Sequence, residues 1–110
     1  MTISEAARDL GCETLQADFA DAPLSGGYTS DLLSDVMANA KAGDVLITIQ
    51  AHKNSVAVAS LLNLPAILVC NSRPIADDMV AAAKEEGIAL FRTAENQFRT
   101  SGRLFALLAG

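Results

Sequence analysis

Tryptophan is absent from this chain, and aromatic residues make up only 5% of its 110 positions. Proteins that bind single-stranded nucleic acid commonly stack bases on aromatic side chains, so this shortage counts against that function. The 13 acidic residues outnumber the 8 basic ones, for a net charge of -5, which on average repels a phosphate backbone. We therefore expect no nucleic-acid partner.

Long hydrophobic runs are also missing. No stretch approaches the ~18 apolar residues that a membrane span needs, and Glu5, Arg8 and Asp9 interrupt the first ten residues where a signal peptide would be apolar. The sequence therefore predicts a cytoplasmic protein without membrane contact.

Cysteine and histidine are too few for the usual metal and redox sites. Cys12 and Cys70 are far apart and lack a C-x-x-C spacing, so we expect two reduced thiols. His52 is the single histidine, and combining it with Cys70 or Asp31 has no supporting metal-ligand spacing. We predict no metal site and no cofactor.

Enzyme signatures are missing as well. The chain has no Gly-Lys dipeptide for a phosphate loop, no G-x-G-x-x-G fingerprint and no G-x-S-x-G nucleophile elbow. We expect no catalytic residues, although a small phosphotransfer or hydrolytic activity using His52 and Asp31 is a remaining, weaker alternative.

Aliphatic residues dominate the composition, which is 51% hydrophobic. The run from Asp44 to Ile49 is nearly continuous in β-branched and aliphatic side chains, which is typical of a strand covered on both faces. Residues 66–70 repeat this pattern, and shorter strands are predicted at 12–17 and 88–91. The glycine pair Gly26-Gly27 permits a sharp turn or a close backbone approach.

Amphipathic or apolar segments alternate with these strands about every 20 residues. Helices are predicted over residues 2–10, 32–40, 55–62, 77–86 and from a cap at Thr93 to the end, with Phe98, Leu104, Phe105 and Leu108 packed inward. Residues 55–62 are apolar all round, which favours burial against the sheet and against a second subunit. The predicted fold is a single α/β domain over residues 1–110: a three-layer α/β/α arrangement with a mainly parallel sheet of four to five strands.

Polar residues follow the predicted strands. In a parallel sheet the loops after the strands share one edge, and the helix N-termini there favour a phosphate or carboxylate. The candidate ligand-binding residues are Gly26, Gly27, Tyr28, Asp31, Gln50, His52, Asn54, Asn71, Ser72, Arg73 and Thr93. Arg73 is the leading candidate because its planar guanidinium can pair with two anionic oxygens. The alternative is that Asn54, Asn71, Ser72 and Thr93 are ordinary turn and cap residues.

The segments 26–37, 44–50, 66–71, 87–88 and 93–98 together resemble the stand-alone proteins of the DRTGG-domain group, which are similar to the N-terminal domain of HPr kinase/phosphorylase. The resemblance implies an α/β regulatory or assembly module without a kinase active site, with dimer contacts as in some regulated pyrophosphatases. The chain departs from the group's pattern. It has His52-Lys53 in place of Asp-Arg and Asn71-Ser72-Arg73 in place of Thr-Gly-Gly.

Two functions remain open at this point. The first is a homodimeric regulatory module that binds a small anionic metabolite or nucleotide beside His52 and Arg73. The second is a protein-protein interaction or oligomerisation module without a small-molecule ligand.

Overall fold

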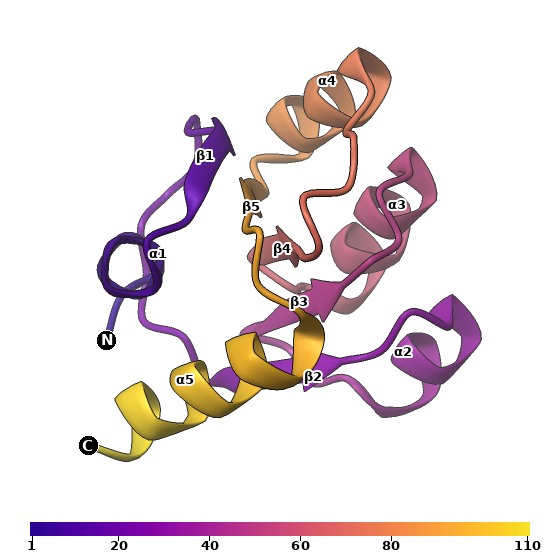
Figure 1. Cartoon of the computed structure of the whole chain (residues 1–110). Coiled ribbons are helices and arrows are strands. Elements are labelled where there is room, and N and C mark those ends of the chain that lie inside the picture. The colour runs from indigo at the N-terminus through magenta and orange to yellow at the C-terminus, as the bar shows by residue number, and fades with distance from the viewer.

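The computed structural model describes all residues from 1 to 110, and its centre is one five-stranded sheet (Figure 1). The strand order is β1-β5-β4-β3-β2. Strands β2 to β5 are mutually parallel, and β1 runs antiparallel to β5 at one edge. The strands span Glu13–Gln16 (β1), Gly26–Thr29 (β2), Asp44–Thr48 (β3), Ala66–Val69 (β4) and Ala89–Arg92 (β5). The predicted mainly parallel sheet is confirmed.

Helices cover both faces of the sheet. One face carries α1 (Ile3–Leu10) and α5 (Gln97–Ala109), and the other carries α2 (Leu33–Asn39), α3 (Lys53–Leu62) and α4 (Asp77–Glu86). Two apolar cores result, one on each side of the sheet. The predicted three-layer α/β/α architecture is therefore confirmed.

The central strands supply both cores at once. Successive side chains of a strand point to opposite faces. In β3, Val45 and Ile47 join the core under α1 and α5, while Leu46 joins the core under α2, α3 and α4. All three are at most 5% exposed. This two-sided burial explains why the sequence of β3 is continuously apolar instead of alternating.

The first helix has the ends that its sequence predicts. The Thr2 hydroxyl accepts from the backbone N–H of Glu5, and the Glu5 carboxylate accepts from the Thr2 N–H, which forms a capping box. Gly11 closes the helix at φ 68°, and Gly87 closes α4 in the same way at φ 66°.

Helix α3 is apolar because other elements of the same chain cover most of it. It lies between α2 and α4 and against β4, and Ser55, Val56 and Ala59 are fully buried there. The predicted burial of residues 55–62 against the sheet is confirmed, and α2 and α4 cover further sides of the helix, while burial against a second subunit stays a prediction. Only Leu61 remains largely exposed among its large side chains.

Helix α5 differs from its prediction in two respects. Leu104 is buried and Leu108 partly buried as expected, but Phe98 and Phe105 are 86% and 76% exposed. The cap is Asn96, whose side chain accepts from the Arg99 N–H at 2.9 Å, whereas Thr93 lies one turn earlier. The phenylalanines suit a helical apolar period, but the sheet beneath α5 has room only for the Thr100 and Leu104 side of the helix.

No helix of the structure combines the length and the hydrophobicity needed to cross a lipid bilayer.

Candidate functional site

The loops that follow β2, β3, β4 and β5 share one edge of the sheet, because these four strands are parallel. Their last residues lie side by side: Thr48 pairs with Val69, and Val69 pairs with Arg92. We name this rim the carboxyl-end edge. Seven of the predicted site residues lie on it: Asp31, Gln50, His52, Asn71, Ser72, Arg73 and Thr93.

Backbone hydrogen bonds join the loops of this edge to one another. The N–H of Ser72 donates to the Thr93 carbonyl at 2.9 Å, and the N–H of Asn71 donates to the Glu95 carbonyl at 3.0 Å. The loop after β4 therefore lies directly against the loop after β5. These two bonds bring the backbones of Asn71, Ser72 and Thr93 together, and a shared ligand site of these residues with His52 stays a prediction.

The loop after β4 has an unusual backbone. Asn71 and Ser72 adopt φ values of 62° and 49°, in the left-handed region, and the Arg73 N–H closes the turn on the Cys70 carbonyl at 3.4 Å. A non-glycine residue in that region costs roughly 1–2 kcal/mol. Ser72 stands where the DRTGG pattern has a glycine, so the loop keeps a glycine-type backbone without glycine. This shape projects Arg73 from the rim.

Helix α3 begins at the carboxyl-end edge. The Nδ1 atom of His52 accepts from the Asn54 N–H at 3.1 Å and so caps the helix. A neutral imidazole that accepts at Nδ1 carries its proton on Nε2, which is then a donor free of intrachain partners. Before the helix, the Gln50 carbonyl accepts from the buried Ser55 hydroxyl at 2.7 Å, and this bond fixes the loop that holds His52.

Among the arginines near this edge, Arg73 differs from the other two. The Arg92 guanidinium forms a bidentate pair with Glu13 at 3.0 Å, and Arg99 pairs with Glu95 at 2.8 Å. Arg73 is exposed, and its guanidinium has no ion-pair partner. Arg73 thus offers an exposed, uncommitted cation in the loop between β4 and α4.

Sequence reasoning overlooked Arg92, Glu95 and Arg99 at this edge. The i,i+4 spacing of Glu95 and Arg99 was a readable signal. The pairing of Arg92 with Glu13 joins residues 79 positions apart, and no local pattern indicates it.

The glycine pair lies elsewhere, which corrects its predicted place in the site. Gly26 and Gly27 belong to β2 and pair with Asp44 and Val45, at the amino end of β3 and opposite the carboxyl-end edge. A Cβ on Gly27 would approach the Leu104 side chain to 3.2 Å, so the glycine lets α5 pack close to the sheet. Of the two readings of this pair, the close approach holds and the turn does not.

Tyr28 and Asn54 also point away from the shared rim. The Tyr28 hydroxyl donates to Asp35 of α2, and Asn54 lies in the first turn of α3, in a shallow hollow that extends to Glu85 and Glu86 of α4. Of the eleven predicted residues, these two and the glycine pair are therefore not gathered with the other seven.

The carboxyl-end edge is open. Five surface hollows found between residues of this chain have other linings, and none of them includes His52, Asn71 or Arg73. The structure also contains no cluster of three or more His, Cys, Asp or Glu side chains arranged to hold a metal ion. An open rim with one free guanidinium suits a ligand that exposes anionic groups, and it lacks the enclosed cavity that many enzymes use to exclude water.

A solved structure has a fold similar to that of this chain. The chain is similar to the crystal structure of the CBS and DRTGG domains of the regulatory region of Clostridium perfringens pyrophosphatase, complexed with the activator diadenosine tetraphosphate. The TM-score is 0.74 at 15% sequence identity, over 93% of this chain and 44% of that one.

The chain thus spans less than half the length of that regulatory region. No protein-family model matches the sequence, and no curated protein matches it either. At 15% identity the likeness shows the fold alone. It supports a DRTGG-like fold, whereas the similarity to HPr kinase/phosphorylase stays a prediction.

Proposed function

We propose that this chain is a non-catalytic regulatory module that binds a small anionic metabolite or nucleotide at the carboxyl-end edge and acts as a homodimer. The unpaired guanidinium of Arg73 is the observation that carries the proposal. Lys53, the first residue of α3, has no ion-pair partner either, so the rim carries two uncommitted cations that an anion would complement.

Two further features support an anion at this rim. His52 offers an Nε2 donor at the start of α3, and the first turn of this helix contains no acidic side chain that would repel an anion, whereas the first turn of α4 contains Asp77 and Asp78. The similar regulatory region binds a nucleotide activator, which carries several phosphates. A polyphosphate is therefore the first ligand class to test.

A thermal-shift screen of nucleotides, dinucleoside polyphosphates, phosphosugars and carboxylates tests the proposal. A ligand at 100 times its Kd stabilises the folded state by about 2.7 kcal/mol, which raises the Tm by several degrees. Arg73→Ala should abolish that rise, and Arg8→Ala, which removes an exposed arginine of α1, should retain it. The rise should also shrink with added salt.

The screen has two outcomes that contradict the proposal. One is that no compound of the panel stabilises the wild-type protein. The other is that Arg73→Ala and the wild type respond equally to the compound that does.

The alternative is a protein-protein interaction or oligomerisation module without a small-molecule ligand. The exposure of Phe98 and Phe105 favours it, because two neighbouring aromatic rings on a helix surface are unusual in a free monomer. If a partner binds both Phe105→Asp and Arg73→Ala as tightly as it binds the wild type, its binding site includes neither the rim nor this surface.

A further inference from the structure

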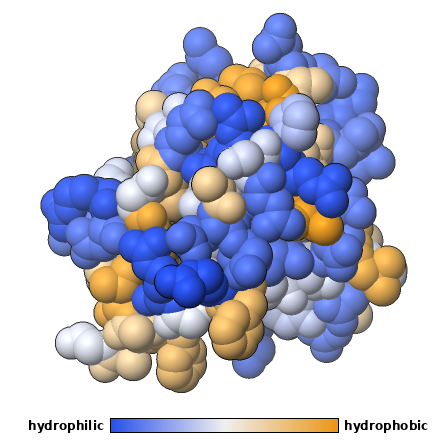
Figure 2. All heavy atoms as spheres, in the orientation of Figure 1, coloured by the Kyte–Doolittle hydropathy of each residue, from blue (hydrophilic) through white to orange (hydrophobic).

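The outward face of α5 is apolar and uncharged. Phe98 and Phe105 lie seven residues apart on this face with Gly102 between them, and all three are exposed. Ala106 and Ala109 continue the same stripe. Figure 2 shows hydrophobic residues gathered at the lower margin of the molecule, where α5 lies in Figure 1. This face has no covering element in the chain.

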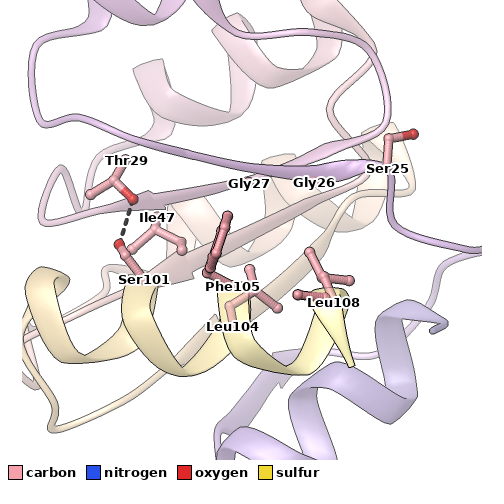
Figure 3. A pocket seen from close by; sticks show the side chains of 10 residues that line it. Ser25, Gly26, Gly27, Thr29, Ile47, Ser101, Leu104, Phe105 and Leu108 are labelled. Carbon is pink, nitrogen blue, oxygen red and sulfur yellow. Dashed lines mark hydrogen bonds between the residues drawn. The ribbon is translucent and has the colours of Figure 1, made fainter.

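A groove adjoins this face. It has a volume of about 460 Å³ and runs between α5 and strand β2, with Phe105 on one side and Gly26 and Gly27 on the other (Figure 3). Gly27 has no side chain to project toward α5, so the backbone of β2 forms this wall of the groove. The Thr29 and Ser101 hydroxyls, 2.6 Å apart, hold its far end closed.

The two edges of the sheet are protected differently. At β1 the pairing register shifts between Thr14 and Gln16, and Glu13 carries a charge, both of which discourage pairing with another strand. At β2, residues 26–29 contain no charged side chain and pair with β3 on one side only. The outer edge of β2 therefore keeps unpaired backbone donors and acceptors beside the groove.

We propose that α5 and β2 together form the interface of a homodimer, which we call the α5–β2 surface: Gly26, Gly27, Phe98, Gly102, Phe105, Ala106 and Ala109. The proposal rests on the homodimer of the proposed function and states where its subunits meet. A second copy is the partner that fits, because identical edge strands related by a twofold axis run antiparallel and satisfy each other's backbone groups.

Charge favours self-association at this surface over a charged partner. The two arginines of α5 are turned to their own chain: Arg99 pairs with Glu95, and Arg103 donates to the carbonyls of Asp9 and Leu10. The five α5 residues of the surface carry no charge, and the Asp44 carboxylate beside Gly26 accepts from the backbone N–H of Lys41 in its own chain. No free cation on this face would select an acidic peptide or a phosphate.

The apolar area of the α5–β2 surface can be compared with the area that a stable dimer buries. The exposed parts of Phe98 and Phe105 together offer roughly 300 Å² of apolar surface. A standard interface buries roughly 800 Å² on each partner. The groove, the alanines of α5 and the edge of β2 surround this pair and can supply the remainder. Gly102 and Ala106, four residues apart, permit close approach of a second helix at the centre.

Sedimentation equilibrium of the wild type and of single variants tests the proposal. The wild type should be dimeric at micromolar concentration. Phe105→Asp should weaken association at least ~30-fold, as expected for a central aromatic residue of an interface. Leu61→Asp is the matched control, because Leu61 is 66% exposed on α3 and lies outside the surface, so its dimer should persist. Circular dichroism checks that both variants are folded.

A fluorescence measurement gives an independent result. Since the chain lacks tryptophan, Phe105→Trp introduces a single probe, and its emission should shift to shorter wavelength as concentration rises and the ring becomes buried. Leu61→Trp should show no such shift. A wild type that stays monomeric at 100 µM by sedimentation, on the order of the weakest functional dimers, overturns the proposal. So does a Phe105→Asp variant that dimerises like the wild type.

The outcome separates this interface from the ligand site. Arg73 follows β4 in the middle of the sheet order, whereas the groove runs along the edge strand β2 and is not lined by Arg73. Arg73→Ala should dimerise like the wild type whether or not the rim binds an anion. If dimerisation fails while a ligand still stabilises the wild type and not Arg73→Ala, the interface and the homodimer are wrong, and the ligand site of the proposed function stands.

Discussion

The Tyr28 hydroxyl donates a 2.8 Å hydrogen bond to Oδ2 of Asp35, and this bond ties strand β2 to helix α2. The amide of Asn39 donates to Oδ1 of the same carboxylate at 2.9 Å. The hydrogen bond from Tyr28, with further ones from Ser30 and Asn39, holds the pKa of Asp35 below its ordinary value. The same contact raises the pKa of Tyr28. Strand β2 pairs with a neighbouring strand on one side only, and this hydrogen bond to α2 gives it an additional contact with the rest of the fold.

This contact predicts acid sensitivity. A carboxyl whose pKa is lowered in the folded state contributes stability that is present at neutral pH and is lost as the pH falls below about 4, toward the folded pKa. Tyr28→Phe should therefore destabilise the protein more at pH 7 than at pH 3, which urea unfolding at the two pH values measures. An equal loss at both would show that the charge of Asp35 plays no part.

Two glycines make a matched pair for stability. A Cβ on either Gly102 or Gly87 would meet no atom within 4 Å, but Gly87 has φ 66° and Gly102 lies inside helix α5. Gly102→Ala should stabilise the fold by about 1 kcal/mol through helix propensity. Gly87→Ala should destabilise it by about 1–2 kcal/mol because alanine is strained in the left-handed region.

Thermal or urea unfolding measures both changes, and a Phe105→Asp background keeps subunit association out of the comparison. If both substitutions change the free energy of unfolding by the same amount, the backbone angle φ does not decide how the two positions tolerate alanine.

Ser55 fixes the loop that carries His52. Its hydroxyl is fully buried and donates to the Gln50 carbonyl at 2.7 Å. Ser55→Ala leaves that carbonyl without its side-chain donor and should cost about 1–3 kcal/mol. Urea unfolding measures the loss. The exposed Ser34 of α2 makes no side-chain hydrogen bond, and Ser34→Ala, its control, should be nearly neutral.

The thiol of Cys12 should react slowly. Burial, and to a lesser extent the neighbouring Cys70 thiol, raise the pKa of Cys12 to about 11. Since the thiolate is the reactive form, the alkylation rate of Cys12 should keep rising beyond about pH 9, where a free thiol of pKa ~8.5 has nearly levelled off. Iodoacetamide labelling followed by mass spectrometry measures this, with glutathione as the reference thiol. A plateau near pH 9 would contradict it.

Much of the fold could be predicted because its signals are local. The continuous apolar runs at β3 and β4 identify strands covered on both faces, and Gly11 and Gly87 mark helix ends. Regular alternation of strands and helices then predicts a parallel sheet. A parallel topology alone predicts that His52, Asn71 and Arg73, which follow successive strands, lie at the same edge of the sheet.

The candidate site could be predicted only in part. The sequence identified residues after strands, but for Gly26 and Gly27 it left open a sharp turn or a close backbone approach, and it placed the pair at the site although the two glycines lie within β2. It also assigned Phe98 and Phe105 to the core on helical period alone. The helical spacing of apolar residues shows which side chains lie on the same face of a helix. It does not show whether another part of the protein covers that face.

The sequence by itself determined the α/β class, the approximate extent of most elements and the rim where polar loops gather, since these depend on local propensity and on the period of apolar residues. Only the tertiary structure decided that β2 is an edge strand beneath α5, that Arg92 and Arg99 have partners while Arg73 has none, and that two phenylalanines face outward. Those outcomes depend on contacts between residues far apart in the chain, such as Glu13 with Arg92, and on the limited area that one sheet face offers to a helix.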